Sequence, residues 1–258
     1  MSRTIIAGMV LLGCGLVTVC ISYFYQKPRS DVIISDRMSD FIDAVDRINV
    51  PHENKLIVFD LDDTAFMSSQ IVGTPTWYYN MVNLMRQSGA AKVESYNVVR
   101  KIDKIIQERV DVKVIENATI SAVNTWQKQG AVVVGLSSRP KDFSTITKNQ
   151  LMQMNLKFSS PYFACIENEW DHHEGAFIDG VLYIDDNASK GVVFEQFLEL
   201  IQKCGMDISL LASADDQQRY ITEMANIAKD NHTDFVGIIY GGALSKRSFD
   251  IIEAKKQL

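Results

Sequence analysis

Short apolar runs recur along the chain and give the first indication of its fold. Four of them lie far apart in the sequence, and most are rich in β-branched residues: Leu56–Phe59, Ala131–Leu136, Ile208–Ala212 and Phe235–Tyr240. Runs without polar alternation are typical of strands that are covered on both faces of a parallel sheet. Between them, apolar residues recur at three- and four-residue steps, which predicts amphipathic helices. Strands that alternate with helices predict an α/β fold with a Rossmann-like, doubly wound parallel sheet.

The helical segments suggest how the chain is divided. Residues 35–49 are predicted to form an amphipathic helix that leads into the first of these strands. The stretch 71–130 has helical periodicity without a convincing strand, and it is too long for a single crossover. We therefore expect a core made of residues 31–70 and 131–258, with a helical cap inserted at 71–130.

The N-terminus carries a separate apolar segment. Residues 5–24 contain no formally charged side chain and are long enough to cross a hydrocarbon layer of about 30 Å as a helix. We predict that residues 1–30 form an uncleaved membrane anchor with a single transmembrane helix. A cleaved signal peptide followed by secretion is the alternative, and a lipid-modified Cys14 fits less well because the apolar run continues past it. The flanking charges do not fix the orientation.

Composition narrows the possible partners. A chain of 258 residues with 47% hydrophobic content can bury a substantial core. Its net charge of -6 provides no basic surface for a phosphate backbone, so nucleic acid is not expected as a structural partner. Outside the N-terminal segment only Cys165 and Cys204 remain, without the spacing of a zinc site. The sequence cannot settle whether they pair, and we favour free, buried thiols.

The candidate chemistry follows the first predicted strand, which ends abruptly in three carboxylates. Asp60, Asp62 and Asp63 stand where that strand gives way to polar sequence. Ligand sites in open α/β sheets lie at the carboxyl ends of the strands. Several carboxylates in one place repel one another unless a cation joins them, and Mg²⁺ prefers such oxygen ligands. The segment therefore predicts a magnesium site.

The sequence from Asp60 to Thr64 resembles motif I of the haloacid dehalogenase (HAD) superfamily, Asp-x-Asp-x-Thr after an apolar strand. This resemblance implies that Asp60 is the nucleophile that becomes phosphorylated and is also a metal ligand. It implies that Asp62 serves as general acid and then as general base, with its carbonyl on Mg²⁺. Phosphatases of the superfamily have this second acid and dehalogenases lack it. Thr64 is placed among the predicted substrate contacts.

Two further motifs of the superfamily have counterparts. The second predicted run ends in Ser137, and the resemblance implies that this hydroxyl binds the transferring phosphoryl group, with Ser138 as the neighbouring possibility. Arg139 either orients substrate or forms a surface ion pair, and we include it with Ser138 among the predicted substrate contacts. Lys190 precedes a clear amphipathic helix and matches the lysine that offsets the charge of nucleophile and phosphate.

The last motif supplies a metal carboxylate, and two pairs compete for it. Asp215-Asp216 is preferred to Asp185-Asp186, because it leaves Lys190 upstream as the order of the superfamily requires. Under this choice, residues 177–184 form a hairpin with a turn at Asp179-Gly180. The sequence leaves open which of the two acids of the preferred pair binds the metal.

Together these motifs predict a Mg²⁺-dependent phosphohydrolase, a phosphomonoesterase acting on a small phosphorylated substrate through an aspartyl-phosphate. A phosphotransferase or mutase of the same superfamily is one alternative. An inactive, membrane-tethered binding protein with this fold is another. The N-terminal segment is similar to those of exported or membrane-anchored bacterial HAD phosphatases, which implies a domain on the extracytoplasmic, periplasmic side.

Overall fold

The computed structural model of the chain describes residues 7–8, 20–21, 28–170, 174–184, 189–243, 254 and 256–257. Within the predicted membrane span, β1 (Ala7–Gly8) pairs antiparallel with β2 (Cys20–Ile21), and the rest of that span lies outside the described residues. Among the helices formed by the described residues, none has the length and apolar character needed to cross a membrane.

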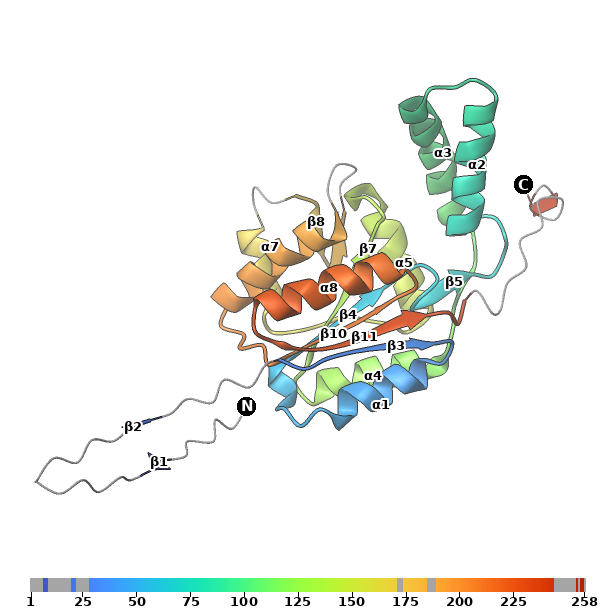
Figure 1. The fold of residues 1–258 in the computed structure, drawn as a ribbon. Helices are drawn as coiled ribbons and strands as arrows, with labels where there is room; N and C mark the ends of the chain where they lie inside the picture. Colours follow the sequence, from blue (N-terminus) through green and yellow to red (C-terminus); the bar gives the residue numbers. More distant parts are fainter. Residues whose placement is uncertain are drawn as a thin grey trace, which may run out of the picture.

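A seven-stranded sheet forms the centre of the molecule, in the order β3-β11-β10-β4-β7-β9-β8 (Figure 1). Its strands are β3 (Ser30–Ser35), β4 (Lys55–Asp60), β7 (Val132–Ser137), β8 (Ala176–Ile178), β9 (Val181–Tyr183), β10 (Leu210–Asp215) and β11 (Asp234–Tyr240). Each neighbouring pair is parallel except β8 and β9, which are antiparallel. The predicted α/β fold with a largely parallel sheet is thereby confirmed.

The four apolar runs correspond to β4, β7, β10 and β11. The third strand is shifted toward the C-terminus, because Ser213 continues the ladder opposite Val58 and Gly237 instead of ending it. The predicted hairpin is β8–β9, and its turn residues Asp179 and Gly180 both have positive φ angles, of 51° and 80°. Two successive positive φ angles match the tightest hairpin turns.

Helices cover both faces of the sheet (Figure 1). One layer contains α1 (Met38–Arg47) and α4 (Asn117–Lys128), and the opposite layer contains α7 (Lys190–Lys203) and α8 (Gln218–Asp230). In the first layer, the buried rings of Phe41, Phe59 and Trp126 pack together with centroids 5.8–6.4 Å apart. The helix α4 thus belongs to the core layer, although the predicted insertion 71–130 included it. Helical periodicity reveals the apolar face of a helix but not the surface against which it packs.

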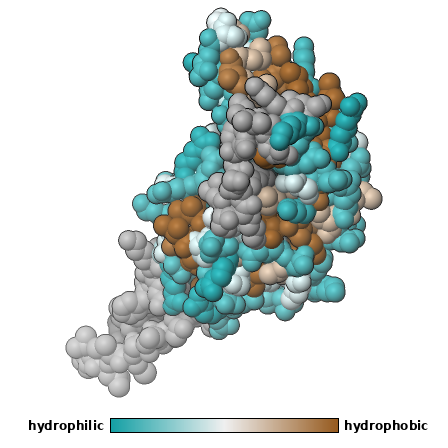
Figure 2. Space-filling model, turned by 90° about the vertical axis from the view of Figure 1, so that its right-hand side faces the viewer, coloured by the Kyte–Doolittle hydropathy of each residue, from teal (hydrophilic) through white to brown (hydrophobic). Residues whose placement is uncertain are grey.

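The cap is a hairpin of two helices, α2 (Pro75–Gln87) and α3 (Lys92–Gln107), that projects from the rest of the molecule (Figure 1). At its base β5 (Phe66–Ser68) pairs antiparallel with β6 (Val112–Val114). Figure 2 shows hydrophobic side chains on the cap at the top of the molecule. Among the apolar residues of α3, Val93 and Ile105 are exposed. The remaining helical elements are α5 (Ser144–Gln153), α6 (Phe163–Glu169) and the 3₁₀ turns His52–Asn54 and Lys141–Phe143.

A disulfide joins α6 to the C-terminal end of α7. Cys165 and Cys204 are bonded, with Cα atoms 6.1 Å apart. The expectation of free thiols was therefore wrong. Sequence spacing could not reveal the pairing, because it depends on how the two helices pack together against the sheet.

Candidate active site

Three adjacent strands deliver the candidate site residues to one edge of the sheet. Asp60 ends β4, Ser137 ends β7 and Asp215 ends β10, and β4 lies between the other two strands. Lys190 is the first residue of α7, and the side chain of Ser189 caps this helix by accepting a hydrogen bond from the Val192 amide. The site therefore lies at the carboxyl edge of a parallel sheet, the usual position of ligand sites in such folds.

Lys190 bridges two of the predicted acids. Its Nζ donates hydrogen bonds to Asp60 Oδ1 at 2.5 Å and to Asp215 Oδ2 at 2.7 Å, and its side chain is 2% exposed. Burial alone would lower the pKa of Lys190, but the two carboxylates raise it above the ordinary value of lysine. The ammonium group therefore stays protonated and compensates part of the negative charge.

The carboxylates of the site still repel one another although Lys190 lies between two of them. Burial raises the pKa of Asp60 well above its ordinary value, Lys190 opposes that shift, and Asp215 and Asp216 reinforce it. Burial and the neighbouring Asp215 raise the pKa of Asp216 to about 7. Several carboxylates thus meet in a poorly solvated place where one ammonium does not balance them.

The carboxylates of Asp60, Asp215 and Asp216 could hold a metal ion, because one oxygen of each lies within 4.8 Å of the other two. Carboxylate oxygens are the ligands that a hard cation such as Mg²⁺ prefers. A divalent cation would also relieve the repulsion that raises the pKa values of Asp60 and Asp216. The residues present therefore fit the metal. The competing pair, Asp185-Asp186, lies outside the described residues.

Asp62 forms an ion pair that the sequence did not indicate. Both of its carboxylate oxygens accept hydrogen bonds from Arg139, from Nε and from Nη2, each at 2.8 Å. The arginine side chain is 8% exposed and that of Asp62 is 26% exposed. Arg139 is therefore a buried partner of the candidate general acid, and the suggested surface ion pair does not describe it.

The predicted hydroxyl residues are placed differently from one another. Thr64 is fully buried and donates to Asp60 Oδ2 at 3.0 Å, so it holds the candidate nucleophile and does not line the cavity. Ser137 accepts a hydrogen bond from the Arg139 amide at 3.1 Å and is also buried. Ser138 lines the cavity beside Arg139.

A cavity of about 490 Å³ lies above these groups, between the sheet edge and the cap. Asp60, Asp62, Lys190 and Asp216 line its core side. The cap side is lined by Tyr78, Tyr79, Tyr96, Arg100, Asp103 and Gln107. None of these six residues belongs to a motif that the sequence analysis identified.

The four cap residues on α3 share a helical face that the sequence could have revealed. Tyr96, Arg100, Asp103 and Gln107 follow one another at steps of four, three and four residues, which places them in one row. Burial raises the pKa of Asp103 to about 6, against the lowering effect of a hydrogen bond from Gln107. This polar row faces the cavity, whereas Val98, Ile102 and Ile105 of the same helix are exposed.

Comparisons with known proteins give the following similarities. A family model described as "Protein of unknown function (DUF2608)" matches residues 35–257. A "Putative outer membrane protein" of Chlamydia trachomatis is 23% identical over 190 residues, which cover 72% of this chain and 69% of that protein. Two structures of the class C acid phosphatase from Bacillus anthracis, the second with tungstate bound, are 16% identical. The matches cover 84% and 85% of this chain and 81% and 82% of those chains, with TM-scores of 0.36 and 0.37. Similarity at this level says nothing about activity.

Proposed function

Because the chain belongs to the DUF2608 family, whose description assigns no activity, we propose its function from the site: a HAD-type, Mg²⁺-dependent phosphohydrolase that cleaves phosphomonoesters. The observation that carries this proposal is the position of Lys190, which bridges Asp60 and Asp215 at the carboxyl edge of the sheet. Asp60 lies 130 positions before Lys190 in the sequence and Asp215 lies 25 positions after it, yet the folded chain brings the three side chains into direct contact. A solvated acidic turn would not place a buried lysine between two buried carboxylates.

The proposed first step is an in-line displacement at phosphorus. An oxygen of Asp60 forms a bond to phosphorus while the bond between phosphorus and the leaving oxygen breaks, and Asp62 gives a proton to that oxygen. Thr64 donates to the other oxygen of Asp60 and so fixes which oxygen attacks. The Lys190 ammonium offsets charge on the nucleophile and the phosphoryl group.

In the second step water attacks the phosphorus of the aspartyl-phosphate. Asp62 takes a proton from this water, the bond between phosphorus and Asp60 breaks, and inorganic phosphate leaves with both side chains restored. Asp60, Asp215 and Asp216 would hold Mg²⁺, and the ion would supply charge stabilisation to the phosphoryl oxygens. Ser137 and Ser138 remain the predicted hydroxyl contacts of the phosphoryl group.

The cavity favours a small substrate. Its volume of about 490 Å³ lies within the range of sites for small molecules, and the cap supplies three tyrosines, Arg100 and Asp103 to bind whatever the phosphate is attached to. A mutase or phosphotransferase of the same superfamily, which would use the same aspartyl-phosphate, stays the alternative to hydrolysis.

We also infer that the domain works outside the cytoplasm. The disulfide between Cys165 and Cys204 requires an oxidising compartment to persist. The chlamydial relative carries the name "Putative outer membrane protein", which agrees with a place in the cell envelope. The anchor at residues 5–24, or secretion after cleavage, stays a prediction. Thiol alkylation before and after reduction of protein from fractionated cells tests the location of the disulfide-bonded form.

The function is tested by phosphate release from a panel of phosphomonoesters, with Mg²⁺ and then with EDTA. We expect the activity of the wild type to require the metal and to be lost in Asp60→Asn. Asp230→Asn, an exposed position at the end of α8, is the matched control and should retain activity. A folded wild type that is inert across the panel would reject the proposal in favour of a binding protein.

A further inference from the structure

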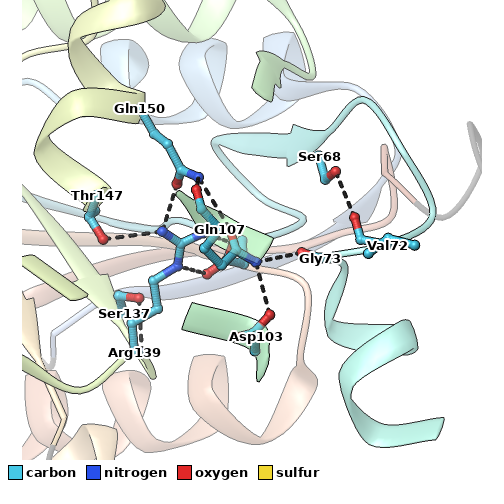
Figure 3. A network of polar contacts seen from close by, with 10 residues as sticks. Ser68, Val72, Gly73, Asp103, Gln107, Ser137, Arg139, Thr147 and Gln150 are labelled. Carbon is cyan, nitrogen blue, oxygen red and sulfur yellow. Dashed lines mark hydrogen bonds and ion pairs between the residues drawn. The ribbon is translucent and has the colours of Figure 1, made fainter. Parts of the chain in front are cut away.

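The side chain of Arg139 donates all its hydrogen bonds to other protein groups (Figure 3). Nε and Nη2 donate to the two oxygens of Asp62, and Nη2 also donates to Gln107 Oε1 at 3.1 Å. Nη1 donates to Thr147 Oγ1 at 3.1 Å and to Gln150 Oε1 at 2.7 Å. A guanidinium has five N–H donors, and these five contacts use them all. In this arrangement Arg139 has no donor left for a substrate.

Gln107 connects this arginine to the cap. It is the last residue of α3, and its Nε2 donates to the carbonyl of Gly73 at 2.7 Å, just before α2 begins (Figure 3). Gln150 on α5 of the core donates to the Gln107 carbonyl at 3.0 Å and to Oε1 at 3.2 Å. The entry and the exit of the cap are therefore fastened to each other and to the core through one buried glutamine.

These contacts form a continuous path from the cap to the candidate general acid. The carbonyl of Gly73, just before α2, accepts a hydrogen bond from Gln107, and Gln107 in turn accepts one from Arg139. Arg139 then donates two parallel hydrogen bonds to the carboxylate of Asp62. Such a two-point contact fixes direction as well as distance, which a single ammonium contact cannot do. A displacement at the end of α3 would remove the Gln107 contact and leave the guanidinium held only by Thr147, Gln150 and Asp62, so the orientation of Asp62 would be less tightly fixed.

Simple stabilisation does not explain the arrangement well. Burying an ion pair costs desolvation energy that its attraction often fails to exceed, and apolar residues of similar size serve stability at least as well. Here the buried cation pairs with Asp62, the carboxylate to which the proposed function assigns proton transfer to the leaving oxygen. We propose that Arg139 and Gln107 are positioning residues, which orient Asp62 and make its orientation depend on the seating of the cap. The catalytic part of this proposal rests on the proposed phosphohydrolase function.

The connection between cap and core can be tested without any activity. Amide hydrogen exchange of the full-length protein is measured over residues 75–107 in the wild type, Arg139→Lys and Gln107→Ala. We expect faster exchange at the C-terminal end of α3 and the start of α2 in both variants. The controls are Arg86→Lys and Gln87→Ala, two exposed cap positions that carry the same substitutions. Unchanged protection in both test variants overturns the connection.

The link to Asp62 is tested by a double-mutant cycle in steady-state kinetics. We expect Arg139→Lys to lower kcat by about 10- to 100-fold with KM changed by less than about 2-fold, because general acid–base catalysis contributes about 10²- to 10⁴-fold and part of it survives. In an Asp62→Asn background the same arginine change should cost nothing more. A loss of the same size in that background, or a loss confined to KM, overturns the positioning role.

The two experiments separate the failure of this inference from the failure of the proposed function. If the wild type releases no phosphate from any substrate, the phosphohydrolase proposal falls, and the role toward Asp62 falls with it. The exchange measurement then still decides whether Gln107 and Arg139 hold the cap. If the wild type is active and the cycle is additive, the phosphohydrolase stands and the positioning role is rejected.

Discussion

Removing the disulfide gives the most quantitative prediction for stability. The change is the pair Cys165→Ser and Cys204→Ser, which opens a loop whose ends are 39 residues apart in sequence. In the chain-entropy model, closing a loop of this size lowers the entropy of the unfolded chain by about 13 cal/mol/K. At 25 °C this corresponds to about 4 kcal/mol of stability, and we expect the variant to lose most of it.

The assay is urea unfolding followed by tryptophan fluorescence and by circular dichroism. The wild type is measured oxidised and after reduction, and the variant is measured with and without the reductant. Reduction should lower the free energy of unfolding of the wild type to that of the variant. The variant itself should not respond to the reductant, which controls for effects of the reagent on other parts of the protein.

Activity gives the second half of this prediction. Lys190 and Cys204 lie at opposite ends of α7, about 20 Å apart along the helix axis. Under conditions where the reduced protein stays folded, kcat should therefore change little. Equal unfolding midpoints for the oxidised and fully reduced wild type would refute the loop-entropy reasoning. A large fall in kcat without unfolding would show that the disulfide helps to place Lys190.

Three further predictions concern charge, metal binding and backbone conformation. Lys190→Met should be more stable at pH 5 than at pH 8 in thermal melts. Burial already raises the pKa of Asp60 in the wild type, so the folded state binds more protons than the unfolded state. The free energy of unfolding therefore falls as the pH rises. A variant equally stable at both pH values would contradict this. Calorimetry should give weaker Mg²⁺ binding at pH 6 than at pH 8, because the pKa of Asp216 is about 7 and a carboxylate must be deprotonated to bind the ion. Equal affinities at the two pH values would count against Asp216 as a ligand. Gly73→Ala should lower the free energy of unfolding in urea by about 1–3 kcal/mol. Gly73 has a φ of 79°, and a Cβ there would lie 3.1 Å from the side chain of Ile106. An unchanged unfolding midpoint would show that the backbone before α2 adapts to the added methyl group.

The sequence predicts those strands of the sheet that are buried on both faces, because burial makes their residues almost uniformly apolar. The strands β4, β7, β10 and β11 are covered by helices on both faces, and each stands out as an apolar run. The edge strand β3 escaped notice because its side chains are mostly exposed, with Ile34 81% exposed. Its place in the sheet depends on hydrogen bonds to β11, for which side-chain patterns give no signal.

The cap shows a different limit of the same reasoning. The helices of residues 71–130 were recognisable from their periodicity, but α4 packs beneath the sheet while α2 and α3 stand away from it. All three helices bury a face, so periodicity alone cannot separate them. The short β5–β6 ladder that divides the cap from the core has three residues in each strand, too few to show a pattern.

The site shows which long-range contacts a sequence can and cannot reveal. Asp62 and Arg139 are 77 residues apart, yet each stands two residues beyond the end of its strand, after Asp60 and Ser137. Since β4 and β7 are neighbouring parallel strands, with Asp60 opposite Leu136, the two side chains follow the same edge of the sheet about one register position apart. That they lie close together could therefore have been predicted once the strand order was known. Gln107 could not, because its contact with Arg139 depends on how the cap meets the core, and neither strand register nor motif spacing determines that.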